Sequence, residues 1–87
     1  MTAATLPTIH RNGTGAQSLA DEYLAVVRAL RLAGEALDNA TCNARDFYPQ
    51  GDEAWSVARK ERDEAFRKLR EVKQYADAWL EHACDHI

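Results

Sequence analysis

The sequence predicts an all-α fold: an antiparallel two-helix hairpin with an extended N-terminal strap, assembling into a homo-oligomeric helical bundle. Apolar residues recur in alternating steps of three and four along two long segments, which is the pattern of amphipathic helices. A connection of about ten residues separates the segments and makes the helices antiparallel neighbours. The chain is therefore treated as one domain, residues 1–87, with these parts: strap 1–14, helix one 15–41, connection 42–51 and helix two 52–84.

Helix two carries a narrow apolar seam, which suits a partner helix rather than a thick globular core. The seam consists of Trp55, Ala58, Arg62, Ala65, Leu69, Val72, Ala76, Trp79 and Ala83. Arg62 needs an acceptor, and Glu35 on helix one is its expected partner; in a cavity between subunits Arg62 would instead anchor a ligand. A second, sparser line is a candidate contact between subunits and consists of Phe66, Leu80, Cys84 and Ile87.

Helix one is expected to begin between residues 15 and 19, because either Thr14 or Ser18 would form a capping box with the residue three positions later. Its seam consists of Leu19, Tyr23, Val26, Leu30, Ala33, Leu37 and Ala40. Gly34 interrupts this helix at a cost of about 1 kcal/mol relative to Ala. That cost would be tolerated where a bulky partner has to approach closely.

The short connection also predicts which residues face each other. Pairing Ala40 with Glu53 sets Gly34 opposite Arg59. It leaves Trp79 beyond the start of helix one, where apolar side chains of the strap can cover it. The strap itself is not expected to be helical, because it contains a proline and an Asn-Gly step.

Composition limits both the fold and the partners. A chain of 87 residues buries too little surface as a pair of helices, so self-association is expected. The net charge of −3 comes from interleaved acidic and basic residues, which argues against duplex nucleic acid or a membrane surface as partner. The sequence contains no apolar run of membrane length and no secretory signal, so we expect a soluble cytoplasmic protein.

Neither a metal centre nor a catalytic site is expected. Cys42 and Cys84 lie in no zinc-binding spacing and are expected to be reduced thiols. His82 and His86 share one helical face, but no third ligand is near them in the sequence. No nucleophile has an adjacent base, and no cofactor fingerprint is present. The sequence therefore predicts a protein that is not an enzyme and needs no cofactor.

Two polar stretches could form a ligand site. Residues 10–14, His-Arg-Asn-Gly-Thr, run into a helix N-terminus, where backbone N–H groups and the helix dipole could hold a phosphate; they could equally be a flexible approach to the helix. Residues 43–48, Asn-Ala-Arg-Asp-Phe-Tyr, combine an arginine for phosphate with aromatic faces for a base. The alternative is a self-satisfied turn in which Arg45 and Asp46 pair with the backbone or with each other and the aromatic rings close the hairpin end.

The same stretches carry a resemblance to a group of small tailed-phage proteins. The group shares an IHxNGT stretch before its first helix and an N(A/G)RD(Y/F)Y stretch in its connection, which are residues 9–14 and 43–48 here. The resemblance extends over most of the chain and implies a phage origin and a helical hairpin, with no firmly assigned activity. It also favours a site, because helix capping alone would not require those side chains. In outline the chain is similar to phage counter-defence proteins that sequester nucleotide signals between protomers.

The leading hypothesis is a non-catalytic binding protein that sequesters a small phosphorylated or nucleotide-derived signal in the cytoplasm of the bacterial host. About 38 Å of helix separates the two stretches, so a shared pocket would need two subunits. The candidate ligand contacts are His10, Asn12, Gly13, Thr14, Arg45, Asp46 and Tyr48. The rival is an inhibitor or adaptor that occludes a host defence protein with an exposed helix face. A role in virion assembly is the third hypothesis.

Overall fold

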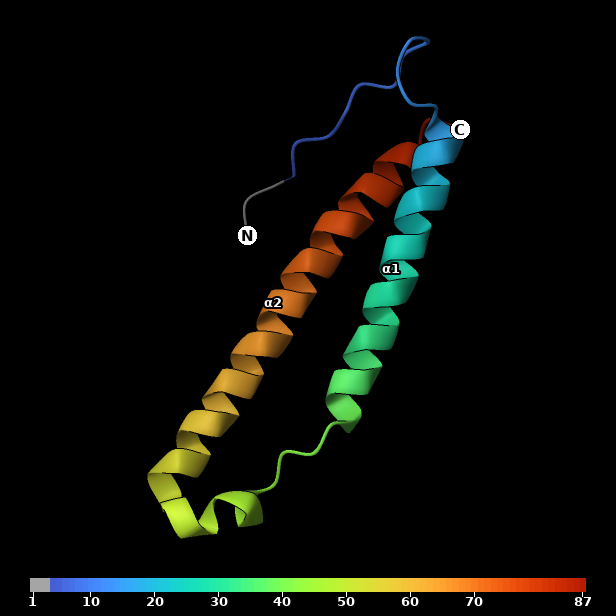
Figure 1. The fold of residues 1–87 in the computed structure, drawn as a ribbon. Helices are drawn as coiled ribbons and strands as arrows, with labels where there is room; N and C mark the ends of the chain where they lie inside the picture. Colours follow the sequence, from blue (N-terminus) through green and yellow to red (C-terminus); the bar gives the residue numbers. More distant parts are fainter. Residues whose placement is uncertain (1–3) are drawn as a thin grey trace.

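A computed structural model describes residues 4–87 of the chain, and every regular element in that range is helical. Helix α1 spans Ala16–Asn39, the 3₁₀ helix η1 spans Ala44–Gln50, and helix α2 spans Asp52–Cys84. The two long helices run antiparallel side by side, and α2 extends beyond the end of α1 (Figure 1). The predicted all-α fold with two packed helices is confirmed. The first three residues of the predicted strap lie outside the described residues.

The helices pair in a different register from the predicted one. Gly34 lies against Leu69 rather than Arg59, a shift of about ten residues, or about 15 Å along α2. Tyr23 stacks on Trp79 with 4.9 Å between ring centroids, so Trp79 does not lie beyond the start of α1. The reason is the connection, which forms η1 instead of turning back at once. The first turns of α2 therefore have no α1 residues beside them.

Gly51 joins η1 to α2 in a backbone conformation that few other residues adopt. Its φ is 95°, which places it in the left-handed region favoured by glycine. Its N–H donates to the carbonyl of Tyr48 at 3.3 Å, closing the last turn of η1. The chain can therefore leave the 3₁₀ helix and start α2 in a new direction without strain at a side-chain-bearing residue.

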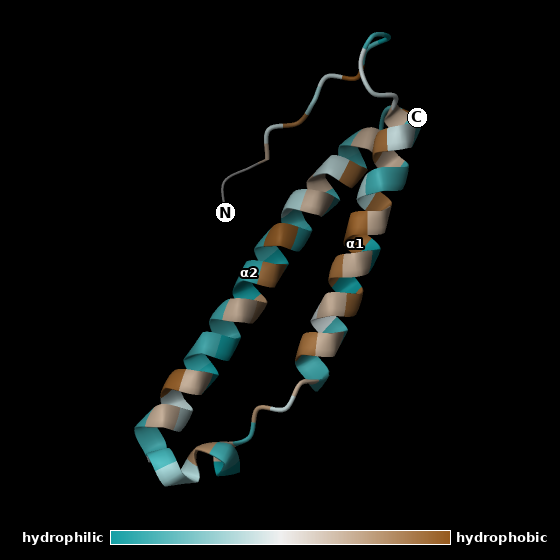
Figure 2. Ribbon diagram, in the orientation of Figure 1, coloured by the Kyte–Doolittle hydropathy of each residue, from teal (hydrophilic) through white to brown (hydrophobic). Residues whose placement is uncertain are grey.

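The tightest packing lies at the end of the hairpin remote from the connection. Leu19, Ala20 and Ala83 form a buried cluster there. It is flanked by half-buried Ile9, Tyr23, Trp79 and Leu80. Burial raises the pKa of Tyr23, and the neighbouring Tyr75 raises it further. Brown apolar stretches along both ribbons continue well beyond this cluster (Figure 2). Most of the apolar surface of the helices therefore stays partly in solvent.

The segment before α1 contacts the C-terminal end of α2 at two points. Ile9 packs against the buried cluster. The imidazole of His82 donates through Nε2 to the carbonyl of Pro7 at 2.6 Å. Leu6, which was expected to cover the same helix end, remains 40% exposed. Among the described residues of this segment, Ile9 and the carbonyl of Pro7 thus hold it to the end of α2.

Replacing Gly34 with alanine is expected to stabilise the chain by about 0.5–1 kcal/mol, because alanine has the higher helix propensity. A Cβ at this position would meet Leu69 Cδ2 at 3.5 Å, which is an ordinary van der Waals distance. The glycine therefore does not serve a close approach, contrary to the sequence-based interpretation. Urea denaturation followed by circular dichroism measures the effect; a loss of stability in Gly34→Ala would contradict it.

Candidate functional site

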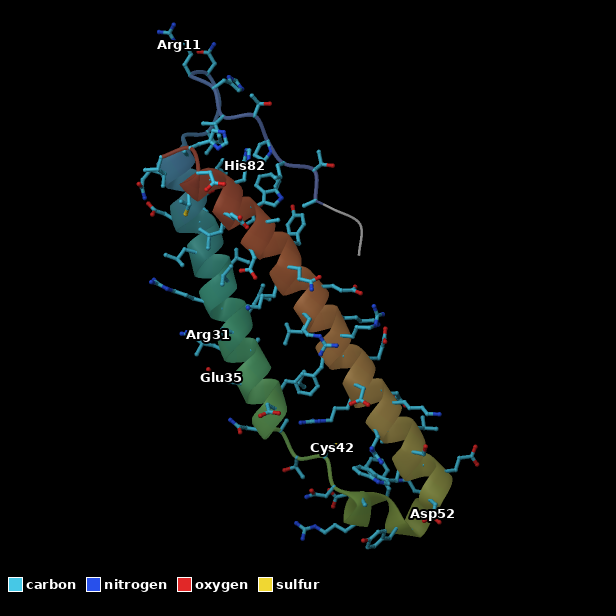
Figure 3. All side chains as sticks on the ribbon, turned by 180° about the vertical axis from the view of Figure 1, so that it is seen from behind. Arg11, Arg31, Glu35, Cys42, Asp52 and His82 are labelled. Atoms are coloured by element: carbon cyan, nitrogen blue, oxygen red, sulfur yellow. The ribbon has the colours of Figure 1, made fainter. Side chains whose placement is uncertain are left out.

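The first polar stretch forms a tight turn before α1. The N–H of Gly13 donates to the carbonyl of His10 at 3.0 Å. The imidazole of His10 folds over this glycine, so a Cβ at position 13 would lie only 2.8 Å from Nε2. Arg11 projects from the tip of the turn, away from both helices (Figure 3). All five residues of the stretch, 10–14, are exposed to solvent.

The start of α1 differs from both predicted capping boxes. Gly15 is the N-cap residue, and no side chain of residues 4–87 caps the helix. Neither Thr14 nor Ser18 donates or accepts a capping bond, because the helix starts between them and a glycine occupies the position where a side-chain oxygen would act. Asp21 instead accepts a hydrogen bond from Gln17 at 2.9 Å. The first N–H groups of α1 therefore face solvent.

The second polar stretch forms the first part of η1. Asp46 N–H donates to the carbonyl of Asn43 at 3.1 Å, which closes the first turn. Phe47 points back to α2, where its ring lies 5.8 Å from that of Trp55. Tyr48 points outward and is 72% exposed. The predicted aromatic closure of the hairpin end thus involves Phe47 and not Tyr48.

A shallow depression lies on η1. It has a volume of about 360 Å³ and is lined by Asn43, Ala44, Arg45 and Tyr48. Within residues 4–87 Arg45 forms no ion pair, so the Arg45–Asp46 side-chain pair of the alternative interpretation is not formed. An exposed guanidinium, an amide and an aromatic ring therefore border one concave surface.

Arg62 has a structural role that differs from the predicted one. It donates to the carbonyl oxygens of Leu37 and Asp38 at 2.9 and 3.1 Å, at the last turn of α1. Its guanidinium also lies 5.2 Å from the centre of the Phe66 ring. Glu35, the predicted partner, points away from α2 (Figure 3). The shifted register places Arg62 beside the end of α1, where backbone carbonyls of the last turn are the available acceptors.

The two polar stretches do not come together within one chain. Helix α1 lies between them and its 24 residues span about 36 Å. The 10–14 turn lies at one end of the hairpin and η1 lies at the other (Figure 1). One chain therefore presents two separate polar surfaces.

A feature that the sequence-based interpretation missed lies on α2, beside the end of α1. Two adjoining grooves of about 450 and 480 Å³ share Val57 and Glu61 in their walls. The predicted second line on α2 does not supply this surface: Phe66 lies beneath Arg62, and Leu80 packs on the buried cluster. The sequence signal for this surface is the helical spacing of Val57, Ala65 and Val72. In the sequence-based prediction, Ala65 and Val72 belong to the seam that faces helix one.

Charged side chains next to the grooves are partly paired within α2. Arg67 bonds to both Glu64 and Glu71. The hydrogen bonds from Arg67 hold the pKa of Glu64 below its usual value. Neither Glu61 nor Lys68 forms an ion pair within the described part of the chain. These two charges therefore remain available to a partner.

Metal ligands and membrane spans are not evident in residues 4–87. No group of three or more His, Cys, Asp or Glu side chains could hold a metal ion there. His86 Nδ1 donates to the carbonyl of His82 at 2.7 Å, so one nitrogen of each histidine is already engaged. No helix in this range is both long and apolar enough to cross a membrane.

Comparison with known proteins gives no relative: the chain matches no protein-family model, no curated protein and no solved structure.

Proposed function

We propose that this chain is a phage-encoded, non-catalytic binding protein that sequesters a small phosphorylated or nucleotide-derived signal in the cytoplasm of the bacterial host. The proposed ligand pockets lie between subunits of a homo-oligomer. In each subunit the segment before α1 is proposed to act as an extended strap over the C-terminal end of α2. The observation that supports it most is the depression on η1, where Arg45 is unpaired beside exposed Tyr48. The proposed contacts are His10, Asn12, Gly13, Thr14, Arg45, Asp46 and Tyr48.

The side chains of η1 suit a nucleotide by their chemistry. The planar guanidinium of Arg45 can donate two parallel hydrogen bonds to one phosphate. The exposed ring of Tyr48 offers a face on which a base can stack. Asn43 supplies both a donor and an acceptor for the edge of that base. A single depression thus has one group for the phosphate and two for the base of a nucleotide.

The open shape of the depression explains why a second subunit is part of the proposal. Small-molecule sites usually bury most of the ligand surface. A depression lined by only four residues, three from η1 and its N-cap Asn43, leaves most of a nucleotide in water. A neighbouring subunit that covers the depression would exclude water and strengthen the contact of Arg45 with phosphate.

Replacing Arg45 with alanine is expected to weaken nucleotide binding by about 10- to 150-fold, the loss of one charge-assisted bidentate contact of about 1.5–3 kcal/mol. Isothermal calorimetry against a panel of cyclic and linear nucleotides measures it. Arg70→Ala, an exposed arginine on α2, is the matched control and should leave the affinity unchanged. No binding by the unmodified chain across the panel would refute the proposal.

A second candidate function is favoured by the exposed apolar side of α2. Val57, Val72 and Tyr75 are each more than 40% exposed. Such a face could occlude a host defence protein by laying one helix into a groove. If a host protein is recovered in a pull-down and no nucleotide of the calorimetry panel binds, this alternative is favoured over sequestration.

A further inference from the structure

One largely apolar face of α2 borders η1 at its start and is otherwise open among the residues that the structure describes. This face, called the outer stripe below, has residues spaced by three, four or seven positions and consists of Ala54, Val57, Glu61, Lys68, Val72 and Tyr75. At about 100° per residue these positions fall within an arc of about 60°. Val57, Val72 and Tyr75 are 47%, 49% and 44% exposed. The two grooves described above run along the first half of the same stripe.

The surface area of the chain argues for a partner. The chain exposes 6544 Å², whereas a folded monomer of 9.8 kDa exposes about 5,200 Å². The excess exceeds the roughly 800 Å² that each partner buries in an interface of standard size. The radius of gyration of 18.4 Å likewise exceeds the value of about 12 Å expected for 87 residues. The hairpin has the surface of one part of a larger bundle.

The outer stripe is complementary to a second copy of itself in one orientation. Its two charges, Glu61 and Lys68, are seven residues apart and have opposite signs. When two α2 helices pack antiparallel about an axis between Glu64 and Ala65, Glu61 faces the partner's Lys68 on both sides of the axis. The same alignment sets Val57 against the partner's Val72. It also sets Ala54 against the partner's Tyr75.

A parallel pair of α2 helices would match the same stripe badly. In register, it would place Glu61 beside the partner's Glu61 and Lys68 beside the partner's Lys68, and both contacts are repulsive. Because both charges are unpaired within the described residues, the antiparallel arrangement gains partners without breaking existing ion pairs. The charge pattern therefore selects the antiparallel arrangement.

Helix α1 has an exposed apolar strip on the same side of the hairpin. Val26 is 40% exposed, and Ala29 and Ala33 are exposed beside it. Around the axis of α1, these residues are rotated by about 90° from the side that faces α2, in the direction opposite to the helical progression of the chain. The outer stripe is rotated by the same amount and in the same sense around the axis of α2. Because the helices are right-handed and antiparallel, the same backward rotation on each leads to the same side of the hairpin. Two hairpins can thus meet face to face.

From this juxtaposition we infer that the protein is an antiparallel homodimer joined through the outer stripes of its α2 helices, in which each η1 depression is closed by the partner subunit's α1 near Val26. The axis between Glu64 and Ala65 brings the start of one α2 level with residues 75–77 of the partner. Tyr23 stacks on Trp79, so Val26 lies at that level too. The depression that holds Arg45 then becomes a pocket between two subunits.

The inference rests on the proposed pocket between subunits and specifies which residues line it. The 10–14 turn lies beyond the last turn of α2, about ten residues or 15 Å further along than the level of Val26. In this dimer the turn of the partner stays outside the pocket. Arg45 and Tyr48 are therefore the ligand contacts that this dimer places in the pocket, and the proposed contacts from the 10–14 turn would reach it only from a further subunit.

Charge exchange tests the dimer directly. Light scattering should give twice the 9.8 kDa chain mass for the unmodified protein. Glu61→Lys creates two like-charge contacts and should raise the dimer dissociation constant at least about tenfold. Lys68→Glu should do the same, and the double variant should restore the dimer. Arg70→Glu, which lies off the stripe, should remain dimeric. A monomeric unmodified protein, or a double variant that stays as weak as either single one, overturns the inference.

Disulfide trapping tests the alignment independently of affinity. In a background with Cys42 and Cys84 replaced by serine, Val57→Cys together with Val72→Cys should give a covalent dimer on oxidation. The two positions are about 22 Å apart within one helix, so they cannot bridge inside a chain. Val57→Cys alone should remain uncrosslinked. A covalent dimer from that single variant would show a different alignment.

The two proposals fail separately. A dimer that passes both tests yet binds no nucleotide would sink the proposed function and leave the interface standing. Nucleotide binding by a monomer would sink the interface alone.

Discussion

Replacing Trp79 with alanine is expected to lower the free energy of unfolding by about 3–5 kcal/mol, the largest stability effect of a single substitution in this chain. Its ring stacks on Tyr23 at 4.9 Å between centroids and lies 6.0 Å from Tyr75. It also packs against the buried cluster at the closed end of the hairpin. A domain with typical stability of about 5–15 kcal/mol would lose a large part of it.

Trp79→Phe is the matched control for this substitution. Trp79 Nε1 is buried and has no hydrogen-bond partner among the described residues. Phenylalanine keeps an aromatic ring in the stack and removes that unpaired donor, so the change should stay within about 1.5 kcal/mol. Urea denaturation at one fixed chain concentration measures both variants, because self-association makes stability depend on concentration. Equal losses in the two variants would contradict the role given to the stacked ring.

Enlarging Ala83 to leucine is expected to cost about 1–3 kcal/mol through overpacking. Ala83 is fully buried, and Leu19 and Ala20 lie in the same cluster. Three additional carbon atoms have no space there, so either the helices separate or neighbouring side chains leave their preferred rotamers. The same denaturation experiment measures the loss.

Ala36→Leu is the control for size and helix propensity. Ala36 is exposed on α1, so leucine there should change stability by less than about 0.5 kcal/mol. If Ala83→Leu were as mild as this control, the closed end would not be the tightly packed part of the fold. If both were severe, the loss would come from leucine in a helix rather than from crowding.

The helices themselves could be predicted because their signals are local. The bounds of α2 agree with the prediction, since Pro49 and Gly51 interrupt helical structure just before it. Helix α1 is three residues shorter than predicted, at Ala16–Asn39, and lacks a side-chain cap. Periodicity alone fixes neither the final turn of a helix nor the residue that starts it.

The alignment of the helices could not be predicted, because it depends on how the connection folds. A tight loop would have placed Ala40 beside Glu53, but the 3₁₀ turns of η1 carry the chain further along before α2 begins. This error also misplaced the partner of Arg62, which bonds to backbone carbonyls of α1 that no side-chain pattern reveals. One unpredicted segment thus shifted every contact between the helices.

The candidate site was predictable in its parts but not in its arrangement. Helix length alone showed that residues 10–14 and 43–48 lie too far apart to meet in one chain. The sequence did not distinguish Phe47, which packs on Trp55, from outward-pointing Tyr48. Nor did periodicity separate seam residues that pack on α1 from Val72, which remains 49% exposed, because both fit a stripe of helical spacing.

The position of the buried cluster at the end remote from the connection affects how the chain folds. In a helical hairpin the contacts next to the loop ordinarily form first, because they join residues that are close in sequence. Here Leu19 meets Ala83, so the best contacts join the most distant segments. Bringing them together costs about 4 kcal/mol of loop-closure entropy before any burial compensates it. Folding of this hairpin is thus limited by a rare long-range encounter, and its amide protons should exchange fastest beside the connection and slowest at the opposite end.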